Sequence, residues 1–198
     1  MSNKQKHRTA FEELYQPHLR SLQNTSYRLT RNSVEAQDLL QETLYKAYRG
    51  FPSFEPDTNF RAWIFRIMVN TYLTHYRKRA KQPLKISYDD LEEFTLYQKS
   101  DQDYQTAVEQ VENISGEMFD DDVQKALNKL PYYFRLVVLL YDVEGFSYQE
   151  ISKMVNIPVG TVMSRLNRGR NLLRSKLKRY AVKKGYAAPE NFHRVSKN

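Results

Sequence analysis

A short stretch near the C-terminal end carries side chains that could read DNA bases. Ser164, Asn167 and Arg168 follow one another at helical spacing. Hydroxyl, amide and guanidinium groups of this kind pair with base edges in the major groove. The opposite stripe of the same helix is apolar: Val162, Leu166, Gly169, Leu173 and Leu177. We expect this helix to dock by its apolar stripe and to face duplex DNA. An amphipathic hairpin with a solvated basic face is the alternative.

The residues before this helix predict a helix-turn-helix. Ser147 and Glu150 have the spacing of a capping box, in which each side chain satisfies a free backbone donor of the other. The apolar residues Ile151, Met154 and Val155 follow at helical spacing, and Asn156 then favours a stop. Pro158 suits the opening of the next helix, where its missing N–H has no cost. Two helices joined by a tight turn are typical of a DNA-reading module.

A second candidate nucleic-acid site lies between residues 51 and 79. Two prolines stiffen the loop 51–59, and in the following helical pattern arginines alternate with aromatic residues. Basic groups can follow phosphates while aromatic rings stack on unpaired bases, each stack contributing about 1–3 kcal/mol. The pattern predicts a site for separated strands. Core packing is the alternative for Trp63, Ile64 and Ile67, and a hydrogen bond within the bundle is the alternative for Asn70.

A third candidate surface lies on the helix expected over 33–50, which Asn32 and Ser33 should cap. Its polar positions recur every three or four residues opposite an apolar stripe that includes Val34: Glu35, Asp38, Glu42, Tyr45 and Arg49. An acidic face on a basic segment is poorly placed for DNA and suits a basic protein surface. A solvated face is the alternative.

Charge divides the 198 residues into three segments. Residues 1–80 carry 13 Lys and Arg against 7 Asp and Glu, residues 81–122 carry 3 against 12, and residues 123–198 carry 15 against 4. Two basic segments joined by an acidic one indicate a polyanion that is bound at two places, with nucleic acid the leading candidate. The acidic segment could follow the path of RNA or serve as a solvated tether.

Composition also argues against several function classes. The chain has no cysteine and four scattered histidines, so we expect no disulfide, metal site or cofactor. No phosphate-cradling glycine loop, clustered acidic metal site or nucleophile with a partner base is recognisable, so we expect no enzyme. We expect the run Asp120–Asp122 to cap a helix instead. No apolar run reaches membrane-spanning length and the N-terminus lacks a signal-peptide core, so we expect a cytoplasmic protein.

The predicted fold is all-α, with two small helical domains. We expect an N-terminal helical bundle over 9–80, whose first helix runs from about 9 to 30 and whose last covers about 60–80. An acidic linker follows over 81–120, with one short helix around 104–112. A helix-turn-helix domain spans 121–178, and its first helix should end at Leu130-Pro131. A basic, mobile tail occupies 179–198.

Four of these stretches together resemble an extracytoplasmic-function (ECF) sigma factor of bacterial RNA polymerase. The stretch Ser33–Thr43 is similar to that family's polymerase-binding helix, and Asn59–Asn70 is similar to the segment that melts and reads the −10 element. Leu130–Arg135 with Gly145–Ile151 resembles the start of the −35-reading domain, and Gly160–Arg170 resembles its recognition helix. Met163 stands where many members carry Lys or Arg. The string from Thr161 to Arg165, with Thr58 and Asn59, resembles the branch that answers thiol-oxidative stress.

The resemblance implies a non-enzymatic subunit that binds core polymerase at its clamp and flap, recognises both promoter elements, opens the DNA and is held by an anti-sigma factor. The implied polymerase-binding residues are Glu35, Asp38, Leu39, Gln41, Glu42 and Tyr45. The implied −10 residues are Phe54, Asn59, Phe60, Arg61, Trp63, Arg66, Asn70 and Arg77. The implied −35 residues are Thr161, Met163, Ser164, Arg165, Asn167, Arg168 and Arg170. A stand-alone helix-turn-helix regulator is the alternative function.

Overall fold

The computed structural model describes residues 3–80 and 120–187, which we call the N-terminal half and the C-terminal half. Every element in these two ranges is helical, and neither range contains a strand, so the all-α prediction is confirmed. The expected acidic linker up to residue 119, its short helix around 104–112 and the end of the tail from residue 188 lie outside the described residues.

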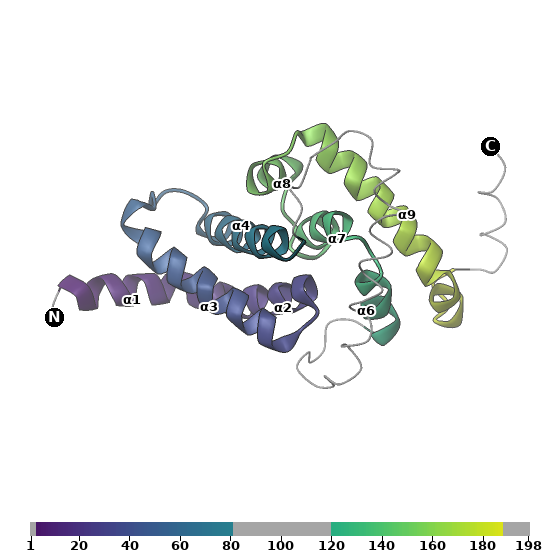
Figure 1. The fold of residues 1–198 in the computed structure, drawn as a ribbon, viewed down its shortest axis with the longest axis horizontal. Helices are drawn as coiled ribbons and strands as arrows, with labels where there is room; N and C mark the ends of the chain where they lie inside the picture. The colour runs from purple at the N-terminus through teal and green to yellow at the C-terminus, as the bar shows by residue number, and fades with distance from the viewer. Residues whose placement is uncertain (1–2, 81–119, 188–198) are drawn as a thin grey trace.

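The N-terminal half begins with a helix that the sequence predicted as one and that the structure divides in two. Helix α1 covers Asn3–Tyr15, a 3₁₀ turn covers Gln16–His18, and α2 covers Leu19–Thr30 (Figure 1). Pro17 causes the interruption, because its ring has no N–H to donate and clashes with the preceding turn of an α-helix. Phe11, Leu22 and Leu29 are the buried anchors of these two helices.

The next two helices have the predicted boundaries. Helix α3 covers Ser33–Gly50, and the Asn32 side chain accepts hydrogen bonds from the backbone of Val34 and Glu35, which confirms it as the N-cap. Helix α4 covers Phe60–Ala80. Between them, a 3₁₀ turn over Phe51–Ser53 opens the expected loop. Asn59 caps α4, since its Oδ1 accepts from the backbone N–H of Ala62 at 3.1 Å.

The C-terminal half contains α6 (Asp121–Asn128), α7 (Tyr132–Val138), a π-helical turn (Leu139–Val143), α8 (Tyr148–Val155) and α9 (Val159–Lys183). The Asp120 side chain caps α6, and Ser147 and Glu150 form the predicted capping box of α8. Asn156 ends α8 in the left-handed conformation, with φ of 57°.

Helix α9 is longer than predicted. It continues through Lys183, so the first five residues of the expected mobile tail are helical. Lys184 then pairs with Asp120 at 2.9 Å, which fastens the end of α9 to the start of α6.

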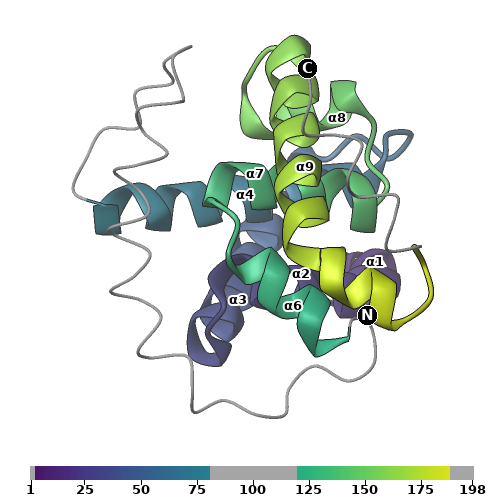
Figure 2. The same cartoon turned by 90° about the vertical axis from the view of Figure 1, so that its right-hand side faces the viewer.

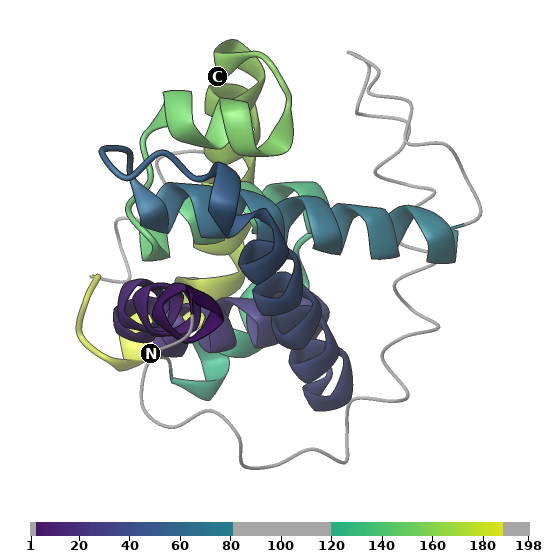
Figure 3. The same ribbon diagram turned by 90° about the vertical axis from the view of Figure 1, so that its left-hand side faces the viewer.

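Helix α4 is the centre of the molecule. It contacts α1, α2 and α3 on one side and α8 on the other, as Figures 2 and 3 show from two directions. The buried side chains of both halves form one continuous apolar core, in which the rings of Phe65 and Phe146 lie 5.0 Å apart. The two predicted helical domains are therefore packed directly against each other. No helix in the described ranges is both long and apolar enough to cross a membrane.

Candidate polymerase and nucleic-acid interfaces

One side of α3 presents an uninterrupted exposed surface, which we call the polymerase face after the partner that the sequence predicts for it: Val34, Asp38, Gln41 and Tyr45. These residues lie at spacings of four, three and four, so they line one side of the helix. Val34 is 66% exposed and Tyr45 is 61% exposed, although both are large apolar or aromatic residues. Exposed apolar groups beside a carboxylate are typical of a surface that is covered by a protein partner.

The structure corrects two assignments on this helix. Leu39, expected to bind polymerase, is fully buried and belongs with Ala36, Thr43 and Ala47 in the row that faces the core. Val34, expected in the apolar stripe, is exposed on the polymerase face instead. Position 34 lies five residues before position 39, and five residues rotate a side chain by more than a quarter-turn around the helix.

Glu42, another expected polymerase contact, is held by neighbours within the chain. Its two oxygens pair with Lys46 Nζ and with His75 Nε2, each at 2.7 Å. The hydrogen bond from Lys46 and the charge of His75 hold the pKa of Glu42 below its usual value. Glu35, the remaining acidic residue, is half-buried at the start of the helix. Asp38 is therefore the exposed carboxylate of the polymerase face.

Aromatic rings gather where the loop 51–59 meets α4. Phe54 lies 5.1 Å from Trp63 and 5.3 Å from Phe60, and Phe60 lies 5.4 Å from Trp63, measured between ring centroids. Phe60 is buried, whereas Phe54 and Trp63 keep part of their surface exposed. His18 stacks on Phe60, and burial with the charge of Arg61 lowers the pKa of His18. This cluster fixes the loop and leaves two partly open ring faces.

The polar residues of α4 divide between two opposite sides of the helix. Arg66, Asn70 and Arg77 are exposed and lie on one side, at spacings of four and seven; we call them the α4 stripe. The exposure of Asn70 favours its role as a surface group over a hydrogen bond within the bundle. Arg61 points to the opposite side of α4, toward the C-terminal half. The structure therefore separates Arg61 from the three residues of the α4 stripe.

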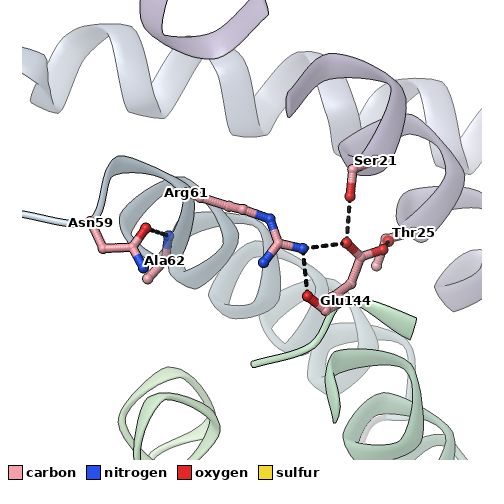
Figure 4. Close-up of polar contacts among 6 residues, drawn as sticks. All are labelled: Ser21, Thr25, Asn59, Arg61, Ala62 and Glu144. Atoms are coloured by element: carbon pink, nitrogen blue, oxygen red, sulfur yellow. Dashed lines mark hydrogen bonds and ion pairs between the residues drawn. The ribbon is translucent and has the colours of Figure 1, made fainter. Parts of the chain in front are cut away.

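Arg61 is bound by a glutamate from the other half of the molecule (Figure 4). Its Nη2 donates to Glu144 Oε2 at 2.8 Å and to the Glu144 backbone carbonyl at 2.7 Å. The hydroxyls of Ser21 and Thr25 also donate to the Glu144 carboxylate. Asn59, at the start of α4, donates to Glu150 Oε1 at 3.3 Å. Two residues expected to bind −10 DNA are thus hydrogen-bonded to the C-terminal half.

Helix α9 presents the predicted reading face: Ser164, Asn167 and Arg168 are all exposed near its N-terminal half. Val162, Leu166 and Gly169 are buried on the opposite side against α7, as the apolar stripe predicted. Met163 is 51% exposed beside the reading face, and Thr161 is half-buried at the helix start. Three polar side chains with different hydrogen-bonding groups therefore project together from the turn-proximal part of a docked helix.

Two flanking arginines of α9 contact other side chains of the C-terminal half. Arg165 is half-buried, with its guanidinium 5.4 Å from the ring centroid of Tyr133. Arg170 forms a two-pronged ion pair with Asp142 and lies 5.0 Å from the ring centroid of Tyr141. The hydrogen bond to Asp142 raises the pKa of Arg170. Both remain at the edges of the reading face, where phosphates flank a helix in the major groove.

Metal chemistry finds no support in the described ranges, where no three His, Asp or Glu side chains come close enough to hold an ion. What the site residues offer is three surfaces for macromolecules: the polymerase face, the α4 stripe with its aromatic loop, and the reading face.

All three of these surfaces lie in segments of the chain that match models of known protein families. Residues 14–82 match the model of sigma-70 region 2, and residues 120–173 match the model of sigma-70 region 4. The first match contains α2, α3 and α4, and the second contains the helix-turn-helix. Together the two matches cover more than half of the chain.

Individual relatives agree with these matches. The chain is 32% identical over 179 residues to the ECF RNA polymerase sigma factor SigE of Mycolicibacterium smegmatis, covering 90% of this chain and 66% of that protein. It is 32% identical over 172 residues to the ECF RNA polymerase sigma factor SigW of Bacillus subtilis, covering 85% of this chain and 89% of that protein.

The fold also resembles solved structures. The sigma factor RpoE of Bartonella quintana, in complex with the anti-sigma factor NepR, superposes with a TM-score of 0.63 at 28% identity, over 85% of this chain and 97% of that one. CnrH, in complex with the cytosolic domain of CnrY, shares the fold at a TM-score of 0.57 and 22% identity, over 86% of this chain and 89% of that one. The chain belongs to the ECF family of RNA polymerase sigma factors, which are transcription initiation factors and not enzymes.

Proposed function

We propose that the three surfaces divide the work of a sigma factor: α3 binds core polymerase, α4 with its loop opens and reads the −10 element, and α9 reads the −35 element. This proposal is supported by two separate exposed polar faces that carry arginine and asparagine, the α4 stripe and the reading face, each within a matched sigma-70 region.

The polymerase face supports docking onto a basic protein surface. Asp38 offers a free-standing carboxylate for charge-assisted hydrogen bonds, while Val34 and Tyr45 offer apolar area beside it. An exposed tyrosine next to a charged group is a common anchor in protein interfaces. We place the polymerase clamp against this side of α3, with Asp38, Gln41 and Tyr45 as contacts and with Glu35 and Glu42 at the margin.

The α4 stripe and the aromatic loop support strand opening. Arg66 and Arg77 can follow the phosphates of one strand, and Asn70 between them can hydrogen-bond an unpaired base. Phe54 and Trp63 present partly open rings at the end of the stripe, held in place by buried Phe60. A site that holds an extruded base offsets the free energy of unstacking, and this favours melting.

The reading face supports recognition of duplex DNA at the −35 element. Arg168 is long enough for a paired contact with guanine, and Ser164 and Asn167 can accept or donate beside it. Thr161 and Met163 lie at the entry to the groove, while Arg165 and Arg170 suit phosphates at its two edges.

Regulation and location follow from the relatives by analogy. RpoE of Bartonella quintana is bound by an anti-sigma factor, and we propose that an anti-sigma factor also holds this chain. We propose that the protein acts in the cytoplasm, on a stress or envelope regulon. The string Thr161–Arg165 with Thr58 and Asn59 suggests thiol-oxidative stress as the inducing class.

Run-off transcription with purified core polymerase tests the proposal. Core enzyme with this chain should produce transcripts of defined length from a subset of candidate promoters, and core enzyme alone should not. Specific binding of the chain to duplex DNA, combined with no promoter-directed transcript from any template, would instead support a stand-alone regulator.

A further inference from the structure

We propose that Glu144 is an intramolecular latch: it holds the two DNA-reading halves closed on each other in the polymerase-free chain, and polymerase binds the open form. This inference rests on the proposed function, because it uses the assignment of the two halves to different promoter elements. The latch itself is defined by contacts within the chain and is tested separately.

The latch joins four side chains from three parts of the fold (Figure 4). Glu144 follows the π-helical turn of the C-terminal half, and its side chain is only 5% exposed. Arg61 approaches from α4, and Ser21 and Thr25 approach from α2, so every group that binds the Glu144 carboxylate comes from the N-terminal half. The carboxylate therefore stabilises the contact between halves and not the fold of its own half.

The negative charge of Glu144 is important because two guanidinium groups lie near it. Burial lowers the pKa of Arg28, also on α2, and the nearby Glu144 carboxylate opposes that shift. Loss of the Glu144 charge would leave two guanidinium groups, Arg28 and Arg61, at the interface without this carboxylate. Removing one member of a buried ion pair is strongly destabilising because the other remains desolvated.

Other contacts cross the same boundary without pairing opposite charges. Arg135 of α7 donates to the Leu29 carbonyl at 2.9 Å, and Arg31 donates to the Leu130 carbonyl at 3.1 Å. The rings of Tyr76 and Tyr132 stack at 4.0 Å. These contacts align the halves, while Glu144 supplies a carboxylate-to-guanidinium pair between α4 and the C-terminal half.

The closed arrangement is too compact for a promoter. Asn59, beside the −10 loop, lies 3.3 Å from Glu150 in the helix-turn-helix. Promoter elements named −10 and −35 are about 25 base pairs apart, which is roughly 85 Å at about 3.4 Å per base pair. Both halves cannot occupy their elements while Asn59 and Glu150 are hydrogen-bonded, so the latch must open before both elements are read.

A distance measurement on the free chain tests the latch. The chain has no cysteine, so single cysteines at the exposed, uncharged positions Gln23 on α2 and Gln149 on α8 allow two spin labels. Pulsed electron resonance should give one narrow distance distribution for the parent chain. Glu144→Gln should shift it to longer and broader distances. Glu13→Gln, which removes an exposed carboxylate from α1, is the matched control and should leave it unchanged.

A milder variant keeps the test valid if Glu144→Gln fails to fold. Thr25→Val keeps the shape of the residue and both charges of the ion pair but removes one hydroxyl donor, so it should produce a smaller shift in the same direction. Circular dichroism should show unchanged helicity for every variant that is scored. Parent-like distance distributions in both Glu144→Gln and Thr25→Val would overturn the latch.

Addition of core polymerase separates the latch from the proposed function. The labelled parent chain should shift to long distances when core enzyme binds. Polymerase binds only the open form, so the closed population lowers the observed affinity of the parent chain for core enzyme. Glu144→Gln should therefore bind core on the order of tenfold more tightly. A polymerase-bound parent chain with the short distance would overturn the coupling. A parent chain that does not bind core at all would contradict the proposed function, while the free-chain distances still decide the latch.

Discussion

Arg135 of α7 reaches across the molecule and donates a 2.9 Å hydrogen bond to the backbone carbonyl of Leu29 at the end of α2. The Arg135 side chain is 3% exposed, and it also reaches the Leu130 carbonyl and the Tyr72 hydroxyl at 3.4 Å. A buried cation therefore terminates a helix of the opposite half.

Replacement of Arg135 by Leu should lower the free energy of unfolding by about 1.5–3 kcal/mol, since buried carbonyls lose charged donors. Thermal denaturation followed by circular dichroism measures this. Arg20→Leu, at an exposed position of α2, is the control and should change stability by less than about 0.5 kcal/mol. Equal melting temperatures for the two variants would show that Arg135 does not stabilise the fold.

Gly169 lies at a close approach of α9 to α7. A Cβ atom at this position would lie 2.8 Å from Val138 Cγ2 and 3.4 Å from Phe134 Cβ. Gly169→Ala should therefore destabilise the chain by about 1–3 kcal/mol through overpacking. Gly160→Ala is the matched control in the same helix, because a Cβ there meets no atom within 4 Å. Urea denaturation should place the midpoint of Gly169→Ala below both the parent and Gly160→Ala; the reverse order would contradict close packing of the two helices.

The polymerase face predicts a charge-dependent loss of binding. Asp38→Lys should weaken binding to core polymerase while leaving helicity unchanged, because Asp38 is exposed and supports no described contact of the fold. Glu13→Lys makes the same charge change on exposed α1 and should bind core like the parent. Equilibrium titration of labelled chain with core enzyme measures both affinities. An Asp38→Lys chain that binds core with the affinity of the parent would contradict the assignment of α3 to the polymerase interface.

The α4 stripe predicts a defect in opening and not in assembly. Arg66→Ala and Asn70→Ala chains should join core polymerase normally but open duplex promoters poorly, because they lose a phosphate contact and a base contact. Permanganate reactivity of unpaired thymines measures opening, with Arg20→Ala as the control on α2. A template with a pre-melted bubble should recover part of the activity. If both variants gave the permanganate reactivity of the parent chain on duplex promoter, Arg66 and Asn70 would have no role in opening.

Arg168 and Arg170 should affect −35 recognition in different ways. Arg168 is exposed on the reading face, so Arg168→Ala should cost about 1–3 kcal/mol and relax the preference at one base position. Arg170 lies at the edge and is paired with Asp142, so Arg170→Ala should weaken all sequences alike and reduce the salt dependence of binding. Competition binding of holoenzyme to single-base variants at two salt concentrations distinguishes these effects; base preferences unchanged by Arg168→Ala would place the reading face elsewhere.

Local signals in the sequence predicted the helices well. The caps Asn32 and Ser147 with Glu150 act on adjacent backbone, so α3 and α8 begin where their sequences indicate. The break at Pro17 was equally local, but the apolar spacing on both sides of it favoured one continuous helix. The end of α9 could not be predicted in this way, because the Lys184–Asp120 pair that fastens it joins residues 64 positions apart.

The contact between halves could not be predicted from sequence. The sequence does not show whether the partner of Arg61 is a phosphate or a carboxylate. Its assignment to DNA followed from the alternation of arginine and aromatic residues and from the resemblance. Arg135 within the apolar run 132–140 was the available signal, since a lone charge among buried residues needs a partner. That signal would predict a buried Arg135, but it could not identify the carbonyls that accept its hydrogen bonds. Helical periodicity placed Val34 in the apolar stripe and the resemblance placed Leu39 among the polymerase contacts, but Val34 is exposed and Leu39 is fully buried.

The most direct test of a two-module sigma factor is selection of binding sites from random duplex DNA by core polymerase reconstituted with this chain. We expect two sequence elements at a fixed spacing, enriched only when chain and core are both present. Arg168→Ala should relax the upstream element and leave the downstream element unchanged. Enrichment of a single element, or of the same sequences by the chain without core, would contradict the assignment of two promoter elements to the two halves.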